Sequence, residues 1–82
     1  MKNEVLSFLD GKISIDSEIC NGKSTIRGTR ITVQTILEFL SAGESHKEIL
    51  RQYPSLTPED IKACLRFATL LMSHNYVVKM TA

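Results

Sequence analysis

Two patterns of apolar residues divide the chain near residue 32. From Thr32 onward, apolar residues recur at intervals of three and four, which is typical of helices that bury one face. Before Thr32 they alternate with polar residues, as in Ile13-Ser14-Ile15, or stand alone, and this pattern favours short strands. The sequence therefore predicts a helical part over residues 32–74, preceded by a small β element within residues 1–31.

Start and stop signals divide the helical part into three helices. The predicted N-caps are Thr32, Ser45 and Thr57, and the predicted stops are Gly43, Pro54 and His74-Asn75. Ser45 is followed three residues later by Glu48, which is the spacing of a capping box. Pro58 follows the third cap, where its ring is pre-organised for the first helical position. Residues 75–82 are read as a tail.

The N-terminal part is harder to assign. Residues 3–9 fit neither the helical nor the strand period, whereas Asp10-Gly11 is a turn signal ahead of a predicted edge strand at Ile13–Ile15. Gly22 and Gly28 predict two tight turns around a short extended piece over residues 24–26. A β element of this size is too small to be stable alone. The predicted fold is one mainly α domain over residues 1–82, a three-helix helix-turn-helix or winged-helix-like unit with a small N-terminal β element.

Residues 46–67 fit a helix-turn-helix, in which a short helix and a turn precede a longer helix that lies on DNA. The acidic residues Glu59 and Asp60 open the longer helix, and they would repel phosphates. Lys62 and Arg66 lie one turn apart and partly offset that repulsion. The alternative is a three-helix packing unit without DNA contact.

The stretch over residues 21–31 is basic and contains no acidic residue. Its cations Lys23, Arg27 and Arg30 would hold phosphates of a nucleic acid, or equally carboxylates of a partner protein. A third reading is structural, with Arg27 or Arg30 paired to the chain's own Glu38 or Asp60. All three readings stay open at this point.

The end of the last helix is apolar on every side from Leu65 to Met72, and a helix segment of this kind is buried all round. In so short a chain this predicts a subunit interface that includes Phe67, Leu70 and Leu71. Packing within the monomer core is the alternative.

Composition narrows the class of protein. With 82 residues, 43% of them hydrophobic, the chain is expected to be one small soluble domain. Its net charge of +1 does not imply that the protein as a whole attracts nucleic acid electrostatically. It has no membrane-length apolar run, and its N-terminus is a poor signal peptide, so a cytoplasmic location is expected. Cys20 and Cys64 are read as small buried hydrophobes. His46 and His74 complete no catalytic or metal-binding set, so neither an enzyme nor a cofactor is predicted.

Residues 13–68 resemble the domain of unknown function 433 family of small bacterial and archaeal proteins. The family pattern is met by a loop, a basic glycine run, a helix end, a proline-containing connection and an alanine in the last helix. In this chain these read Asp16-Ser17-Glu18-Ile19, Gly22-Lys23-Ser24-Thr25-Ile26-Arg27-Gly28-Thr29-Arg30-Ile31, Leu40-Ser41-Ala42-Gly43, Tyr53-Pro54-Ser55-Leu56-Thr57-Pro58-Glu59-Asp60-Ile61, and Ala63. Ser17 and Ser24 stand where the family tends to have proline.

The resemblance implies a winged-helix-like or homeodomain-like dimer, similar to antitoxins encoded beside a toxin of PIN-like nuclease fold. The expected function is thus a DNA-binding antitoxin of a type II toxin–antitoxin pair, with operator DNA and a PIN-like toxin as partners. It would form a homodimer through the N-terminal strands and the last helix. Lys23, Arg27 and Arg30 would contact the DNA backbone, and Lys62 and Arg66 a groove. The alternative is a protein-interaction module that holds a partner through the basic loop and the apolar helix, without DNA.

Overall fold

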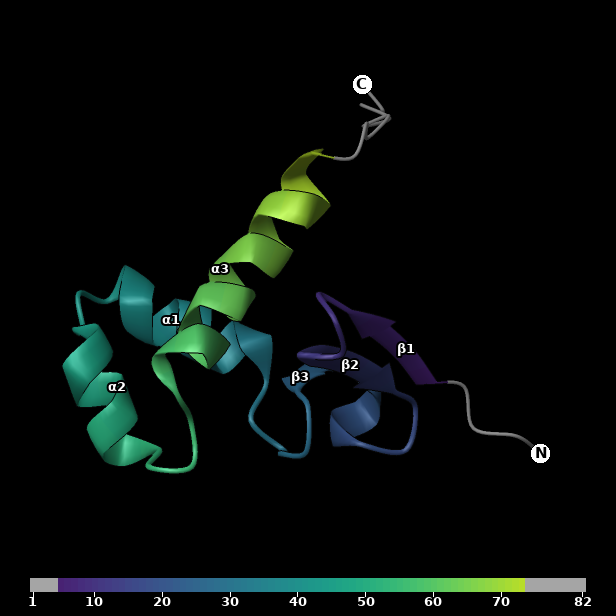
Figure 1. Cartoon of the computed structure of the whole chain (residues 1–82), viewed down its shortest axis with the longest axis horizontal. Helices are drawn as coiled ribbons and strands as arrows, with labels where there is room; N and C mark the ends of the chain where they lie inside the picture. Colours follow the sequence, from purple (N-terminus) through teal and green to yellow (C-terminus); the bar gives the residue numbers. More distant parts are fainter. Residues whose placement is uncertain (1–4, 74–82) are drawn as a thin grey trace, which may run out of the picture.

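The computed structural model describes residues 5–73, which form three strands and three helices (Figure 1). The strands are β1 (Val5–Phe8), β2 (Ile13–Asp16) and β3 (Ser24–Ile26), with a short 3-10 turn at Cys20–Gly22 before β3. The helices are α1 (Val33–Ser41), α2 (His46–Gln52) and α3 (Pro58–Ser73). The fold is therefore mixed α/β, and the predicted mainly α class is wrong.

The strands form one antiparallel sheet in the order β1-β2-β3. Phe8 pairs with Ile13 across β1 and β2, and Ile13 pairs with Ile26 across β2 and β3. The predicted edge strand at Ile13–Ile15 is thus the central strand, because the ambiguous N-terminal segment supplies a strand on its outer side. The predicted extended piece between Gly22 and Gly28 is confirmed as β3, and both glycines have positive φ.

The sheet is a structural layer of the domain because its side chains enter the core. Ile13 and Ile26 are buried beside residues of all three helices. The ring of Phe8 on β1 packs on Phe67 of α3, with ring centroids 5.2 Å apart. Burial of this apolar area stabilises the sheet and α3 together, which explains why a sheet too small to be stable alone persists here.

The predicted N-caps of the helices are confirmed. The hydroxyls of Thr32 and Ser45 accept the amide protons three residues later, at N···O distances of 3.1 Å in both cases. At α3, Asp60 and Thr57 cap each other: Thr57 N donates to Asp60 Oδ2, and Asp60 N donates to Thr57 Oγ1. Each cap satisfies amide groups that the first helical turn leaves without partners. The predicted stop at His74-Asn75 and the tail lie outside the described residues.

α1 ends in a Schellman motif at Gly43, which confirms the helix stop predicted at this glycine. Glu44 N donates to the carbonyl of Phe39, and Gly43 N donates to that of Leu40, both at 3.0 Å. Gly43 has φ +94°, a conformation that side chains with a Cβ rarely adopt. The chain thereby reverses sharply into α2.

The three helices meet around isoleucines that are almost fully buried. One comes from each helix: Ile36, Ile49 and Ile61. The buried residues of α3 end at Phe67, and the last turns of the helix extend away from the body of the domain (Figure 1).

The two cysteines differ in burial. Cys64 is fully buried on α3, as predicted, and burial raises the pKa of its thiol to about 11, with a smaller contribution from the nearby Asp60 charge. Cys20 is only half-buried, and its Sγ donates to the carbonyl oxygen of Arg30 at 3.3 Å. Both are free thiols.

Candidate functional site

The tight turn between β1 and β2 lies beside the N-terminal half of α3. Leu9, Asp10 and Gly11 all have positive φ, and the turn is closed by Gly11 N donating to the carbonyl of Phe8 at 3.1 Å. Asp and Gly tolerate this conformation better than most residues, which is why the Asp10-Gly11 pair predicts the turn. The turn brings Lys12 to the face of the molecule on which α3 exposes its charged residues.

Two adjoining hollows, of about 300 and 250 Å³, lie between this turn and α3. They share Asp10 and Lys12 and therefore adjoin; together they are here called the charged trough. The larger hollow is lined on α3 by Glu59, Lys62 and Arg66, and the smaller one by Arg27 and Asp60. The trough therefore collects four cations and three carboxylates from three separate parts of the chain: the turn between β1 and β2, the loop after β3, and α3.

The carboxylate of Asp60 is partly committed to the protein itself. Its Oδ2 accepts from Thr57 N at 2.9 Å, and its Oδ1 lies 3.9 Å from Lys12 Nζ. Within residues 5–73, Arg27, Lys62 and Arg66 make no ion pair or side-chain hydrogen bond. Three cations of the trough thus have donors available for an external anion.

The structure brings together three of the five basic residues singled out from the sequence. Arg27, Lys62 and Arg66 line the trough, whereas Lys23 and Arg30 are exposed and line neither hollow. The residue that sequence reasoning missed is Lys12, and the signal for it was its position directly after the Asp10-Gly11 turn.

The hypothesis that Arg27 or Arg30 pairs with the chain's own acidic residues finds no support in the described residues. Asp60 lies near Lys12, and Glu38 accepts from Gln34 at 3.1 Å. Neither arginine of the basic stretch pairs with these acids in the part of the chain that the structure covers.

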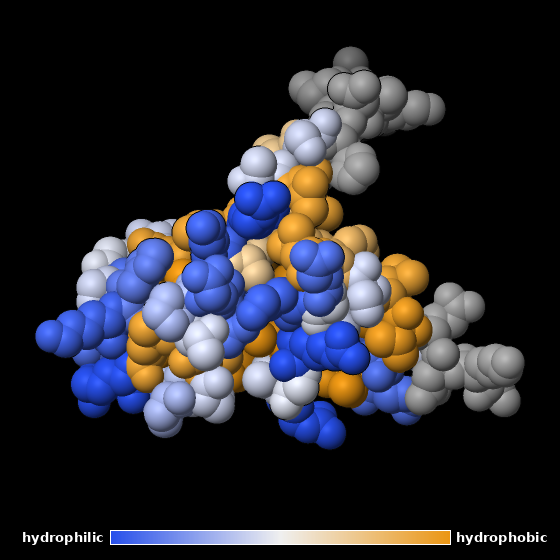
Figure 2. Space-filling model, viewed as in Figure 1, coloured by the Kyte–Doolittle hydropathy of each residue, from blue (hydrophilic) through white to orange (hydrophobic). Residues whose placement is uncertain are grey.

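A second surface is apolar and lies on the projecting end of α3. Leu65, Leu70 and Leu71 are 41–44% exposed, and Met72 is 73% exposed. Next to them, a groove of about 300 Å³ runs between α1 and α3, lined mainly by apolar side chains that include Val33, Leu37 and Ala68. Figure 2 shows this apolar surface as orange along α3, whereas blue side chains gather across the middle of the same view.

The predicted interface residues of this segment do not share one environment. Leu70 and Leu71 are on the surface, but Phe67 is 5% exposed and belongs to the core. Leu65 begins the segment that the sequence predicts to be buried all round, but it is exposed. An all-apolar helix end gives no sequence signal for which side faces the core, so packing decides.

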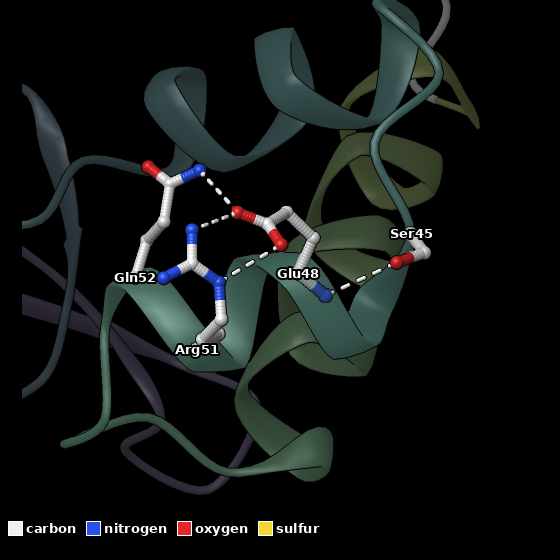
Figure 3. Close-up of polar contacts among 4 residues, drawn as sticks. All are labelled: Ser45, Glu48, Arg51 and Gln52. Atoms are coloured by element: carbon white, nitrogen blue, oxygen red, sulfur yellow. Dashed lines mark hydrogen bonds and ion pairs between the residues drawn. The ribbon is translucent and has the colours of Figure 1, made fainter.

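A second polar cluster lies on α2 (Figure 3). Arg51 donates from Nε and Nη2 to the two carboxylate oxygens of Glu48, and Gln52 Nε2 donates to Oε2 of Glu48 at 3.1 Å. All these residues lie within one helix and its cap, so the cluster stabilises α2 rather than forming a pocket. The hydrogen bond from Arg51, then that from Gln52, lowers the pKa of Glu48 to about 2.

This cluster gives a prediction for pH dependence. Because the folded pKa of Glu48 lies below its ordinary value of 4.5, its contribution to stability is complete above pH 4.5 and is lost as the pH falls to about 2. We expect Glu48→Gln to make the melting temperature less sensitive to pH in this window than that of the unchanged protein. Melting curves at several pH values between 2 and 5 measure the effect, with Glu18→Gln, an exposed loop carboxylate, as the charge-matched control. Equal slopes for the three proteins would contradict the prediction.

The described residues, 5–73, can be compared with the requirements of a metal site and of a membrane span. No group of three or more His, Cys, Asp and Glu side chains there is arranged to hold a metal ion. His46 is exposed on α2, and His74 lies outside the described residues. None of the helices in the described part has the length and apolar character needed to cross a membrane.

These features define a small mixed α/β domain with a charged trough on one face and an apolar helix end. Comparison with models of known protein families shows to which family the chain belongs. The family of proteins of unknown function DUF433 matches residues 13–68, and the chain belongs to this family. The match runs from β2 into α3, so it includes Arg27, Lys62 and Arg66 but not Lys12. No curated protein and no solved structure matched the chain.

Proposed function

We propose that the protein is a DNA-binding antitoxin that binds duplex DNA through the charged trough. The observation that supports this proposal is the gathering of Lys12, Arg27, Lys62 and Arg66 around two adjoining hollows. Three of these cations, Arg27, Lys62 and Arg66, make no ion pair within residues 5–73, and Lys12 is paired only with Asp60 at 3.9 Å. Such cations are suited to phosphate oxygens, which account for much of the affinity of proteins for DNA. The antitoxin role itself comes from the family resemblance described above.

The carboxylates in the trough restrict how DNA would bind. Asp10, Glu59 and Asp60 lie among the cations, so the trough has a small net positive charge and binding by charge alone would be weak. Contacts to phosphates at particular positions are therefore favoured over deep insertion of α3 into a groove.

The apolar end of α3 supplies the protein contacts of the proposed function. Exposed leucines and a methionine beside an apolar groove suit a second subunit or the toxin, because apolar surfaces of this kind mark interaction sites. We place the homodimer contact and a toxin of PIN-like fold at this surface. The trough lies closer to the other half of α3, so both activities are compatible in one molecule.

A second candidate function is favoured by the same apolar surface. The protein would then be an interaction module that binds a partner protein through the end of α3, with the trough cations holding the partner's carboxylates. This function requires no DNA. An enzymatic role is not proposed for either candidate.

The experiment that tests the first candidate is fluorescence anisotropy with a duplex from upstream of the protein's own gene, at two salt concentrations. The expected result is tighter binding to the upstream duplex than to random DNA. The logarithm of the affinity should fall linearly with the logarithm of the salt concentration, with a slope that corresponds to about two to four phosphate contacts. A random duplex is the control. Equal affinity for both duplexes, also after addition of the product of the neighbouring gene, would reject DNA recognition and favour the interaction module.

A further inference from the structure

The side chain of Arg27 lies directly over the turn between β1 and β2. Its guanidinium lies so close to Gly11 that a Cβ on that residue would collide with Nη1. Gly11 also has φ +83°, which favours glycine in the turn, and a side chain at this position would displace the guanidinium of Arg27 from where it lies. The backbone of Arg27 is fixed to the same turn, because its N–H donates to the carbonyl of Lys12 at 2.9 Å.

The smaller hollow of the trough, of about 250 Å³, therefore has two cations at its rim with different geometry. Arg27 presents a planar fork of N–H donors, and Lys12 presents a single ammonium group on a side chain that is 46% exposed. Lys12 forms an ion pair with Asp60 at an Nζ–Oδ1 distance of 3.9 Å. This distance is too long for a hydrogen bond, so the N–H donors of Lys12 can still turn to another anion.

The two carboxylates of this hollow do not neutralise Arg27 directly. Asp60 accepts from Thr57 N at the start of α3, and no ion pair joins Arg27 to Asp10 or Asp60 within residues 5–73. With two cations and two carboxylates around it, the hollow does not attract anions by net charge. Selection there depends on directed hydrogen bonds, and a guanidinium fork matches an anion with two oxygens in one plane.

We propose that this hollow is a phosphate-binding subsite, in which Arg27 donates two hydrogen bonds to two phosphate oxygens and Lys12 supplies a point charge. The absence of a side chain at Gly11 leaves room for Arg27 over the turn. The inference rests on the proposed function for the source of the phosphate, a phosphodiester of the DNA backbone. The same chemistry would bind inorganic phosphate, and the experiment separates the two sources.

The first arm measures DNA affinity for Arg27→Gln and Arg30→Gln at several salt concentrations. Both variants remove one exposed arginine from the same loop, but only Arg27 lines the hollow. Arg27→Gln is expected to reduce the salt slope by about 0.9 and the affinity about five- to tenfold near 0.1 M salt, whereas Arg30→Gln changes neither. Arg27→Lys is expected to keep the slope and lose part of the affinity, since the charge stays and the fork is lost.

The second arm needs no DNA. Amide spectra by NMR are recorded during titration with inorganic phosphate, with chloride at equal ionic strength as the reference. Selective shifts at Gly11, Lys12 and Arg27 that vanish in Arg27→Gln support the subsite. If these shifts occur but no DNA binds, the proposed function fails and the subsite stands for free phosphate. If DNA binds equally well to Arg27→Gln and the shifts are missing, the subsite is overturned and the proposed function stands. If both arms are negative, both proposals fail.

Discussion

Replacing Phe67 with alanine is expected to lower the free energy of unfolding by about 3–5 kcal/mol, which is the usual cost of removing a buried aromatic ring. Phe67 is 5% exposed and packs against the ring of Phe8 in a tilted arrangement, so the change removes contacts of α3 with the core and with β1. For a small domain with a total stability of roughly 5–15 kcal/mol, this is a large part of the whole. Urea denaturation followed by circular dichroism measures it.

Leu70→Ala is the matched control, because Leu70 lies one turn further along the same helix and is 42% exposed. Its effect on the unfolding of the monomer is expected to be below about 1 kcal/mol, and it should instead weaken self-association in sedimentation experiments. Comparing the two variants distinguishes Phe67, the buried residue of the predicted interface, from Leu70, an exposed one. Similar small losses of stability for both variants would show that Phe67 is not a core residue.

The double variant Lys62→Gln with Arg66→Gln is expected to lose more than about tenfold in DNA affinity near 0.1 M salt, and to reduce the salt slope by about 1.8. Both side chains are exposed on α3 and line the larger hollow, so each would contribute one phosphate contact. The circular dichroism spectrum should not change, because neither residue makes an ion pair or side-chain hydrogen bond within residues 5–73. Anisotropy titrations with the upstream duplex give both quantities.

The chain offers a control with the same change in charge. Lys23→Gln with Arg30→Gln also removes one lysine and one arginine, and these two residues lie outside the trough. This second double variant is expected to bind DNA within about twofold of the unchanged protein, apart from a small effect of net charge. Equal losses in the two double variants would mean that the total charge, and not the trough, determines binding.

Much of the local structure was available from the sequence. The caps at Thr32, Ser45 and Thr57 and the glycine stop at Gly43 are confirmed, because each depends on hydrogen bonds between residues only a few positions apart. The turn at Asp10-Gly11 is confirmed for the same reason. The family membership was also predicted from short motifs, and the family match over residues 13–68 confirms it.

The fold class was wrong because it depended on contacts between distant segments. Residues 5–8 have no clear period, and they become a strand by pairing with residues 13–16 and by packing Phe8 on Phe67. Local propensity contains no information about such a partner, and a strand's stability comes mostly from its neighbours.

For the candidate site, the sequence by itself determined which side chains are basic, which of them follow turns, and that Lys62 and Arg66 share a helix face. Only the tertiary structure decided that Lys12 and Arg27 join them, whereas Lys23 and Arg30 lie apart. The physical reason is that exposed charges obey no spacing rule between elements. Their positions follow from how the apolar residues of the sheet and α3 pack together, and Ile13, Ile61 and Phe67 fix that packing from inside the core.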